Sequence, residues 1–289
     1  MAYIDLHVHS TCSDGSFTPE ELVALAKETG LRGMALTDHD LITGNKRAAA
    51  AAREAGIEFI QGMEMMTDHR GRSLHIVCLG FDEESVAFKR LYKILRDSKE
   101  KPMKKIVAAM QKSGVDISWE KILPYAEAGR LDSYSIMRYL VAQYGHHIKG
   151  IWHKYIAPAL SSTGADKSIE AAEALPLVRE AGGVTSLAHF HKKRGLGGLK
   201  RSEQEEFIQE LVACGLDGME AWYPDYSEED AAFAARMIAK YQLLATGGSD
   251  FHGANRPGVM LGMGLGEELA VPYRYLEEIR KTCHERRKK

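Results

Sequence analysis

Short apolar runs in this chain repeatedly end in side chains of the kind that bind metal ions. His7 and His9 follow a run that is typical of a strand, and residues two apart in a strand point to the same side, so both imidazoles aim at one point. Five further runs end in the same way. The endings together contain His7, His9, His39, Glu64, His75, His189, Asp250 and His252. One such ending would mean little, but six in one chain predict a centre of several metal ions.

The apolar periodicity predicts alternating strands and helices. The first helix begins at Thr18, where Pro19 suits the first turn and Glu21 completes a capping box, and it stops at Gly30. Further strands are expected at 33–36, 57–60, 74–79, 184–187, 218–222 and 243–246, and further helices at 46–55, up to 181, at 203–214 and from 228. Repeated units of this kind favour a parallel barrel, in which ligands cluster where the carboxyl ends of the strands meet.

The alternation breaks in the middle of the chain. Two lysine-containing helical patterns, a turn at Gly129 and Arg130 and a helix over 134–144 predict an inserted helical subdomain at 99–159. The barrel is then expected in two parts, at 1–98 and 160–289. The insert either caps the barrel and buries apolar surface or shapes a substrate pocket.

Composition narrows the function. A formal net charge of −2 argues against a protein that coats duplex DNA, so a small anionic substrate fits better. The 4 cysteines are far apart in sequence and predict neither a disulfide framework nor a thiolate zinc site. We find no apolar run near the roughly 20 residues that span a bilayer and no signal-peptide pattern, so a cytoplasmic protein without membrane partners is expected.

The ordered motifs resemble the PHP (polymerase and histidinol phosphatase) family of metal-dependent phosphoesterases. The likeness is greatest to its stand-alone branch, which acts on 3′,5′-bisphosphate nucleotides and short RNA, and it covers nearly the whole chain. The motifs, in family order, are His7-Val8-His9, Ser13-Asp14-Gly15, Thr37-Asp38-His39-Asp40, Glu64, His75, Ala188-His189 and Gly248-Ser249-Asp250-Phe251-His252. The resemblance implies an α/β fold, a distorted (β/α)7 barrel of the TIM type, whose helical insert shapes the substrate pocket.

The resemblance also implies three metal sites. By it, His7, His9, Glu64 and Asp250 would hold the first metal, Glu64, His75 and His189 the second, and Asp14, His39 and His252 the third. Histidine and carboxylate ligands without thiolate suit Mn²⁺, Fe²⁺ or Zn²⁺, so we expect two to three divalent transition-metal ions. Glu64 would bridge two of them, and a metal-bridging hydroxide would attack the phosphate.

Four of the ligands also have a structural interpretation. His75 alone would more often be a hydrogen-bonded core residue, and Glu64 could be a surface glutamate, although Met63 and Met65 beside it make exposure improbable. Asp14 and Asp250 lie in good turn sequences. The ordered set as a whole favours metal binding.

The substrate-binding motif of the family is altered in this chain. Where the nucleotide-acting branch often carries Gly-Arg-x-His and a second arginine, Ser133 and Ser135 occupy the first Arg and the His positions and Arg138 the second Arg position. Lys154 matches a family lysine that faces the phosphate. The run Lys192-Lys193-Arg194 either supplies charge to the substrate by another route or is a solvated loop.

Two further features have alternative interpretations. His191 could protonate the leaving oxygen, since a histidine pKa lies near 6.5, or it could be a surface residue. The aromatic pair Trp222 and Tyr223 could stack a nucleobase or could simply pack.

We expect a metal-dependent phosphoric ester hydrolase that acts on a small nucleotide, such as a 3′,5′-bisphosphate or the end of a short oligonucleotide. Two alternatives stay open: a phosphatase for a non-nucleotide phosphorylated metabolite, which the altered motif makes more credible, and a non-catalytic metal-binding accessory protein. A sequence-nonspecific nucleic-acid binding module fits the net charge poorly.

Overall fold

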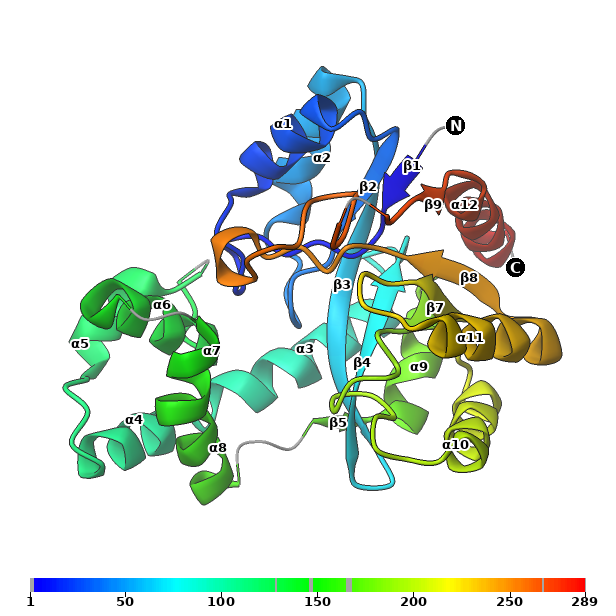
Figure 1. Cartoon of the computed structure of the whole chain (residues 1–289). Coiled ribbons are helices and arrows are strands. Elements are labelled where there is room, and N and C mark those ends of the chain that lie inside the picture. Colours follow the sequence, from blue (N-terminus) through cyan, green and yellow to red (C-terminus); the bar gives the residue numbers. More distant parts are fainter. Residues whose placement is uncertain (1–2, 128, 146–147, 165–167, 267, 289) are drawn as a thin grey trace.

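A sheet of nine strands forms the centre of this computed structural model, which describes residues 3–127, 129–145, 148–164, 168–266 and 268–288 (Figure 1). The strands follow the spatial order β8-β7-β6-β4-β3-β2-β1-β9, and β5 pairs with β3. They are β1 (Tyr3–Asp5), β2 (Gly33–Leu36), β3 (Glu58–His69), β4 (Arg72–Leu79), β5 (Ile169–Glu170), β6 (Val184–Leu187), β7 (Gly218–Trp222), β8 (Leu244–Gly247) and β9 (Val271–Pro272).

The sheet nearly closes on itself where β1 approaches β8. The N–H of Leu6 donates to the carbonyl oxygen of Gly247 at 3.2 Å, and Val8 pairs with Phe251 in parallel. Among the described strands, β1, β2, β3, β4, β6, β7 and β8 therefore make up a nearly closed barrel. This confirms the distorted seven-stranded barrel that the resemblance implied.

One strand of the barrel runs against the others. β4 is antiparallel to both β3 and β6, whereas β2 is parallel to β1 and β3. Only Arg70 and Gly71 separate β3 from β4, and both have a positive φ, of 52° and 73°, which suits a tight hairpin. A parallel neighbour would need a long crossover connection. The uniformly parallel barrel expected from the repeated units is therefore wrong at β4.

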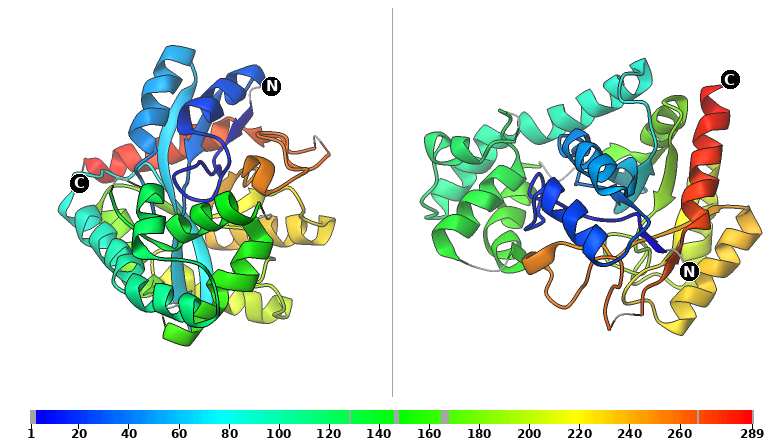
Figure 2. Two further views of the ribbon diagram at one scale, coloured as in Figure 1. Left: turned by 90° about the vertical axis from the view of Figure 1, so that its left-hand side faces the viewer. Right: turned by 90° about the horizontal axis from the view of Figure 1, so that it is seen from above.

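Helices lie around the outside of the barrel (Figure 2). They are α1 (Pro19–Glu28), α2 (Asn45–Ala55), α3 (Val86–Glu100), α9 (Ala171–Glu180), α10 (Arg201–Ala213), α11 (Glu228–Tyr241) and α12 (Arg274–Arg287). The capping box expected at Thr18 and Glu21 is present, with the Thr18 N–H donating to the Glu21 carboxylate at 2.8 Å. Within the described ranges, no helix combines the length and apolarity needed to cross a membrane.

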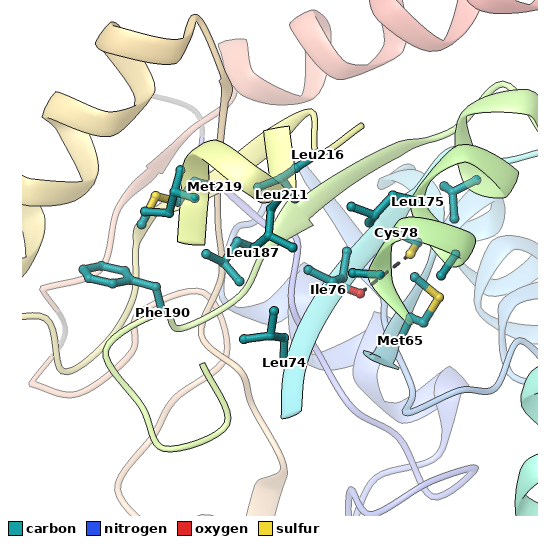
Figure 3. Packing of buried hydrophobic residues seen from close by; sticks show 14 of the residues in the cluster. Met65, Leu74, Ile76, Cys78, Leu175, Leu187, Phe190, Leu211, Leu216 and Met219 are labelled. Atoms are coloured by element: carbon teal, nitrogen blue, oxygen red, sulfur yellow. Dashed lines mark hydrogen bonds between the residues drawn. The ribbon is translucent and has the colours of Figure 1, made fainter. Parts of the chain in front are cut away.

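The alternation of side chains along β3 and β4 separates the core from the barrel interior. Leu74, Ile76 and Cys78 of β4 pack outward with Leu175 of α9 and Leu211 of α10 (Figure 3). Successive strand residues face opposite sides, so His75, between Leu74 and Ile76, points into the barrel. Glu64 lies between Met63 and Met65 of the same outward cluster and points inward for the same reason.

The segment between α3 and β5 forms a group of helices beside the barrel (Figure 1). It contains α4 (Met103–Lys112), α5 (Trp119–Ile122), η1 (Leu123–Tyr125), α6 (Ser133–Tyr144), α7 (Ile148–Ile151), η2 (Trp152–Ile156) and α8 (Ala157–Thr163). Buried residues from Met103 to Ala159 make a hydrophobic cluster of their own. α3 continues to Glu100, across the expected boundary at 98–99, so the division into 1–98, 99–159 and 160–289 stays a prediction.

A buried ion pair joins α3 to this helical group. Arg96 donates to the Asp132 carboxylate at 3.1 Å, and the two side chains are only 2% and 0% exposed. Asp132 also caps α6, since its other carboxylate oxygen accepts from the N–H of Ser135 at 3.0 Å. The pair therefore fixes the start of α6 against α3.

We predict that Arg96→Met lowers the free energy of unfolding by about 3–5 kcal/mol, because Asp132 would stay buried without a counter-charge. Denaturant unfolding measures the change. Lys93→Met on the exposed face of α3 is the control and should cost no more than about 0.5 kcal/mol. Adding Asp132→Asn to Arg96→Met should restore much of the loss. Equal losses for Arg96→Met and Lys93→Met would contradict this role.

Candidate metal centre

The nine predicted ligand residues come together at one end of the barrel. His7 and His9 follow β1, His39 follows β2, His189 follows β6, and Asp250 follows β8. These parallel strands place their carboxyl ends at the same side. His75 lies near the start of β4, and because β4 is antiparallel, its start reaches this same end.

Three groups of ligand atoms, each within 4.8 Å of one another, lie at this end. One is the predicted set of His7, His9, Glu64 and Asp250. The other two differ slightly from the predicted sets, because His9 joins Asp14, His39 and His252, and His39 joins Glu64 and His75. His189, predicted for the second set, is also adjacent, with Nε2 2.9 Å from Oε1 of Glu64.

Glu64 lies at the centre of these groups and is fully buried. Burial alone would raise its pKa, but the surrounding histidines, His75 and His39 first, hold the pKa well below its ordinary value. The carboxylate is therefore ionised. Five imidazoles surround it: His75 Nδ1 at 2.8 Å, His189 Nε2 at 2.9 Å and His7 Nε2 at 3.3 Å from Oε1, and His39 Nδ1 at 2.9 Å and His9 Nε2 at 3.2 Å from Oε2.

Several buried polar atoms of these residues make no hydrogen bond, because their close contacts with one another, such as that of His39 Nδ1 with Glu64 Oε2, lack hydrogen-bond geometry. Leaving such atoms unsatisfied costs roughly 1–3 kcal/mol each, so they require an explanation. They are His7 Nε2, both ring nitrogens of His9, His39 Nδ1, Glu64 Oε2, His75 Nε2 and His189 Nδ1. Imidazole and carboxylate are donors that suit divalent transition metals, so the residues present fit a metal centre.

Glu220, which sequence analysis missed, orients two of the ligand residues. It lies on β7, is 1% exposed, and places Oε1 2.8 Å from Nδ1 of His7. Its Oε2 accepts from the backbone N–H of His189 at 2.6 Å. With Nδ1 of His7 held by Glu220, Nε2 faces Glu64 and Asp250 and is the nitrogen that would bind a metal. The sequence did contain a signal for Glu220, because a carboxylate within an otherwise apolar strand indicates a buried polar role.

Asp250 is held by two groups that leave one of its oxygens facing the centre. The hydroxyl of Tyr223 donates to Oδ2 at 2.6 Å, and Arg256 donates to the same oxygen at 2.5 Å. Oδ1 then lies 3.2 Å from Nε2 of His9. Tyr223 is 5% exposed, so it packs and positions Asp250, and a nucleobase-stacking role is not supported for it.

Two further buried carboxylates missed from the sequence shape the backbone of the centre. Asp5 accepts from the N–H of His7 at 3.2 Å and from the N–H of Ser249 at 2.9 Å, which joins the two ligand loops. Asp38 accepts from the N–H of Ser10 at 2.8 Å and the hydroxyl of Ser13 at 2.6 Å. Both therefore act on the loops rather than at the centre itself.

The guanidinium of Arg138 faces backbone carbonyl oxygens. Its NH1 group faces the carbonyl oxygens of Cys12 and Ser13 at 3.1 Å each, and NH2 donates to the carbonyl of Tyr125 at 2.8 Å. These acceptors use the guanidinium N–H groups. Arg138 thus joins the helical insert to the loop that carries Asp14.

The other predicted substrate residues fall into two groups. Ser135 is buried and belongs to the capping box of α6, and Lys154 is exposed, with its ammonium 4.9 Å from the ring centroid of Tyr155. Neither lines the cavities described below. Ser133 and Arg194 do line a cavity.

His191, expected as a candidate general acid, pairs with a carboxylate. Its Nε2 lies 2.9 Å from Oδ1 of Asp225, whose other oxygen is bound by Lys192. Burial alone would raise the pKa of Asp225, but His191 and Lys192 lower it well below its ordinary range. Asp225 is thus ionised and holds the orientation of the imidazole.

A cavity of 220 Å³ opens onto the candidate metal centre. The ligand residues Asp14 and His39 form part of its wall, and the ring of Tyr134 stacks on His39 with centroids 5.7 Å apart. Trp152 and His153 of the helical insert and Arg194 of the barrel complete the opposite side. A small anionic group could therefore reach the ligand residues between barrel and insert.

Comparison with known proteins agrees with this arrangement. The family model described as "PHP domain" matches residues 5–154. A 5′-3′ exoribonuclease of Haemophilus influenzae is 32% identical, over 86% of this chain and 89% of its own length. A phosphoribosyl 1,2-cyclic phosphate 1,2-diphosphodiesterase of Eggerthella lenta is 30% identical, over 86% of this chain and 94% of its own length.

A solved structure has the same fold throughout. It is a putative metal-dependent phosphoesterase from Bifidobacterium adolescentis, which superposes with a TM-score of 0.83 and 28% identity over 97% of this chain and 96% of its own. The family model covers more than half of this chain, and the relatives cover most of it. The chain therefore belongs to the PHP family and is a metal-dependent phosphoester hydrolase.

Proposed function

We propose that this protein hydrolyses a phosphate ester of a small nucleotide, either a 3′,5′-bisphosphate nucleotide or the end of a short oligonucleotide. The observation that carries the proposal is Glu64, a buried ionised carboxylate surrounded by five imidazoles with unsatisfied nitrogens. The names of the relatives support a phosphate diester substrate, since they are an exoribonuclease and a cyclic phosphate diphosphodiesterase.

Two to three divalent ions would be held by the nine predicted ligands. His7, His9, Glu64 and Asp250 would bind one ion, Glu64, His75 and His189 a second, with His39 adjacent, and Asp14, His39 and His252 a third, with His9 adjacent. When bound, such ions lower the pKa of water and offset the negative charge of a phosphate. Which of Mn²⁺, Fe²⁺ and Zn²⁺ is used depends on availability as well as on ligands.

Individual side chains would have different roles in the proposed hydrolysis. Glu64 would bridge two ions, and Glu220 would orient His7 through its Nδ1 nitrogen. His191, oriented by Asp225, would donate a proton to the leaving oxygen. We assign Arg138 a positioning role, because carbonyl oxygens already occupy its guanidinium. Lys154 receives no role, because it is exposed and its ammonium lies over the ring of Tyr155.

A non-nucleotide phosphorylated metabolite is the second candidate substrate. It is favoured by the absence of a positive charge at Ser133 and Ser135 and by the engagement of Arg138 with backbone carbonyls. The relative from Eggerthella lenta, whose name specifies a phosphoribosyl cyclic phosphate, supports it as well. A non-catalytic accessory role has no such support.

The decisive experiment is a substrate panel. Metal-loaded protein is assayed against 3′,5′-bisphosphate nucleotides, mononucleotides, short 5′-phosphorylated RNA and sugar phosphates, and release of inorganic phosphate and of nucleotides is measured. The proposal expects the nucleotides to have the highest kcat/KM. Preferential hydrolysis of sugar phosphates would favour the second candidate.

We predict that the purified protein holds two to three metal ions per chain and that Glu64→Gln loses more metal than Asp14→Asn does. Glu64 contacts ligands of more than one group, whereas Asp14 belongs to one group alone. Elemental analysis of protein expressed in metal-supplemented medium measures the content. Glu54→Gln, on the exposed side of α2, is the control and should keep the full content. Full metal content in Glu64→Gln would argue against a bridging carboxylate.

Metal binding should release protons and become tighter as the pH rises. Burial alone would lower the pKa of His9, but the carboxylates of Asp250 and Glu64, each 3.2 Å from its Nε2, outweigh burial and raise the pKa to about 10. Metal-free protein therefore carries a proton on His9 at pH 7, and a metal must displace it. Calorimetric titration in buffers of different ionisation enthalpy measures the release. A metal affinity that does not change between about pH 6 and 9 would contradict this.

Glu220→Gln should weaken metal binding by about ten- to a hundredfold, because it removes the negative charge that orients His7 and raises the basicity of its Nε2. Competition with a chromogenic chelator measures the affinity, and circular dichroism checks the fold. The exposed Glu54→Gln serves again as the matched control. Unchanged affinity in a folded Glu220→Gln protein would leave Glu220 with a packing role only.

A further inference from the structure

A second and larger cavity lies between the helical insert and the β3–β4 hairpin. It has a volume of 710 Å³ and shares Trp152, His153 and Arg194 with the 220 Å³ cavity at the metal centre. The two cavities are therefore adjacent. Arg194 lies where they meet, and Asp14 and His39 line only the smaller one. Sites for small molecules usually measure roughly 300–1,000 Å³, so the larger cavity can take a group of nucleotide size.

The wall of the larger cavity is positively charged. Arg72, Lys99, Lys193 and Arg194 line it, and its described lining includes no aspartate or glutamate. Two of these cations already have partners. Lys99 lies 3.1 Å from Oδ2 of Asp40, and Arg72 donates to the carbonyl oxygens of Gly195 and Gly197 at 3.1 and 3.2 Å.

Within the described part of the chain, the other two cations have neither a carboxylate nor a carbonyl oxygen as a partner. Across the residues that the structure describes, neither Lys193 nor Arg194 has an ion pair, whereas the preceding Lys192 is bound to Asp225. The guanidinium of Arg194 lies 5.4 Å from the ring centroid of Trp152, and NH1 is 3.7 Å from the sulfur of Met66. Neither contact cancels its charge.

The loop that presents Arg194 is tightly held. A Cβ atom at Gly195 would lie 2.8 Å from the carbonyl oxygen of Phe190, and one at Gly197 would lie 2.4 Å from that of His191, so both positions require glycine. Arg72 binds the carbonyl oxygens of these same two glycines. The loop backbone that presents Arg194 therefore has a defined shape.

We propose that this cavity binds a second anionic group of the substrate, a phosphate, through Arg194 and Lys193 while the reacting phosphate lies at the metal centre. The inference rests on the proposed phosphoesterase function and specifies its substrate as a compound with at least two phosphate groups. The cations come from the barrel loop 192–197, since on the insert side Ser133 contributes only a hydroxyl and Arg138 is bound to carbonyl oxygens.

The test compares Arg194→Ala with a matched arginine on adenosine 3′,5′-bisphosphate, adenosine 3′-monophosphate and adenosine 5′-monophosphate. Arg236 is exposed, stacks on Phe233 with its guanidinium 5.6 Å from the ring centroid and lies outside both cavities, so Arg236→Ala is the control. Arg194→Ala should lower kcat/KM for the bisphosphate by about ten- to a hundredfold, mainly through KM, with little change for the monophosphates. Arg194→Lys should recover part of the loss.

Binding gives a second measurement. The nucleoside monophosphate product, which keeps the second phosphate, is titrated calorimetrically into the metal-loaded protein and should bind Arg194→Ala more weakly by a similar factor. Equal losses of kcat/KM on mono- and bisphosphates, or no loss on the bisphosphate, would overturn the proposal.

Failure of this inference can be told apart from failure of the proposed function. If wild type hydrolyses the bisphosphate and a monophosphate equally well and Arg194→Ala matches it, the cavity has no such role but the nucleotide phosphoesterase stands. If nucleotides are not hydrolysed but a hexose bisphosphate is, with the same dependence on Arg194, the second anion site stands and the nucleotide assignment fails.

Discussion

The whole arrangement depends on one buried negative charge, the carboxylate of Glu64. A carboxylate with no exposure to water is unfavourable unless cations compensate it, and neutral imidazoles whose lone pairs face it would add repulsion. The surrounding groups therefore require positive charge among them, whether protons on the histidines or metal ions. Six strands bring ligands to this point and a seventh, β7, brings Glu220, so compensating the charge of Glu64 and closing the barrel are linked requirements.

The outline of the fold and the ligand set could be predicted because both follow from local patterns. Strands 33–36, 184–187 and 218–222 were predicted with the bounds that the structure has, and the capping box at Thr18 formed as expected. The antiparallel β4 was missed because the strand–helix rhythm was extended across a two-residue turn. Glu220 was missed because an acid within an apolar strand was given no role.

Other contacts could not be predicted because they depend on how distant segments dock. Arg138 binds the carbonyl oxygens of Cys12 and Ser13, which lie 126 and 125 residues earlier in the chain. Nothing in the local sequence distinguishes this arginine from one that faces a phosphate. The same holds for Lys99, which reaches Asp40 beside the ligand His39. Arg138 of the insert and Lys99 at the end of α3 thus contact two loops that carry ligand residues, so the shape of the pocket and the geometry of the ligands are not independent.

The hairpin of β3 and β4 has a consequence for how such a protein can change. Glu64 and His75 lie where the hairpin passes the barrel, whereas Met66, Arg72 and Ser73, toward its tip, line the larger cavity. The same pair of strands thus carries ligands of the metal centre and lines one side of the larger cavity. Residues added or removed at the tip would lengthen or shorten that wall while the register at Glu64 and His75 stays in place. The depth of the larger cavity can therefore change by insertion and deletion in the hairpin while the metal centre stays the same.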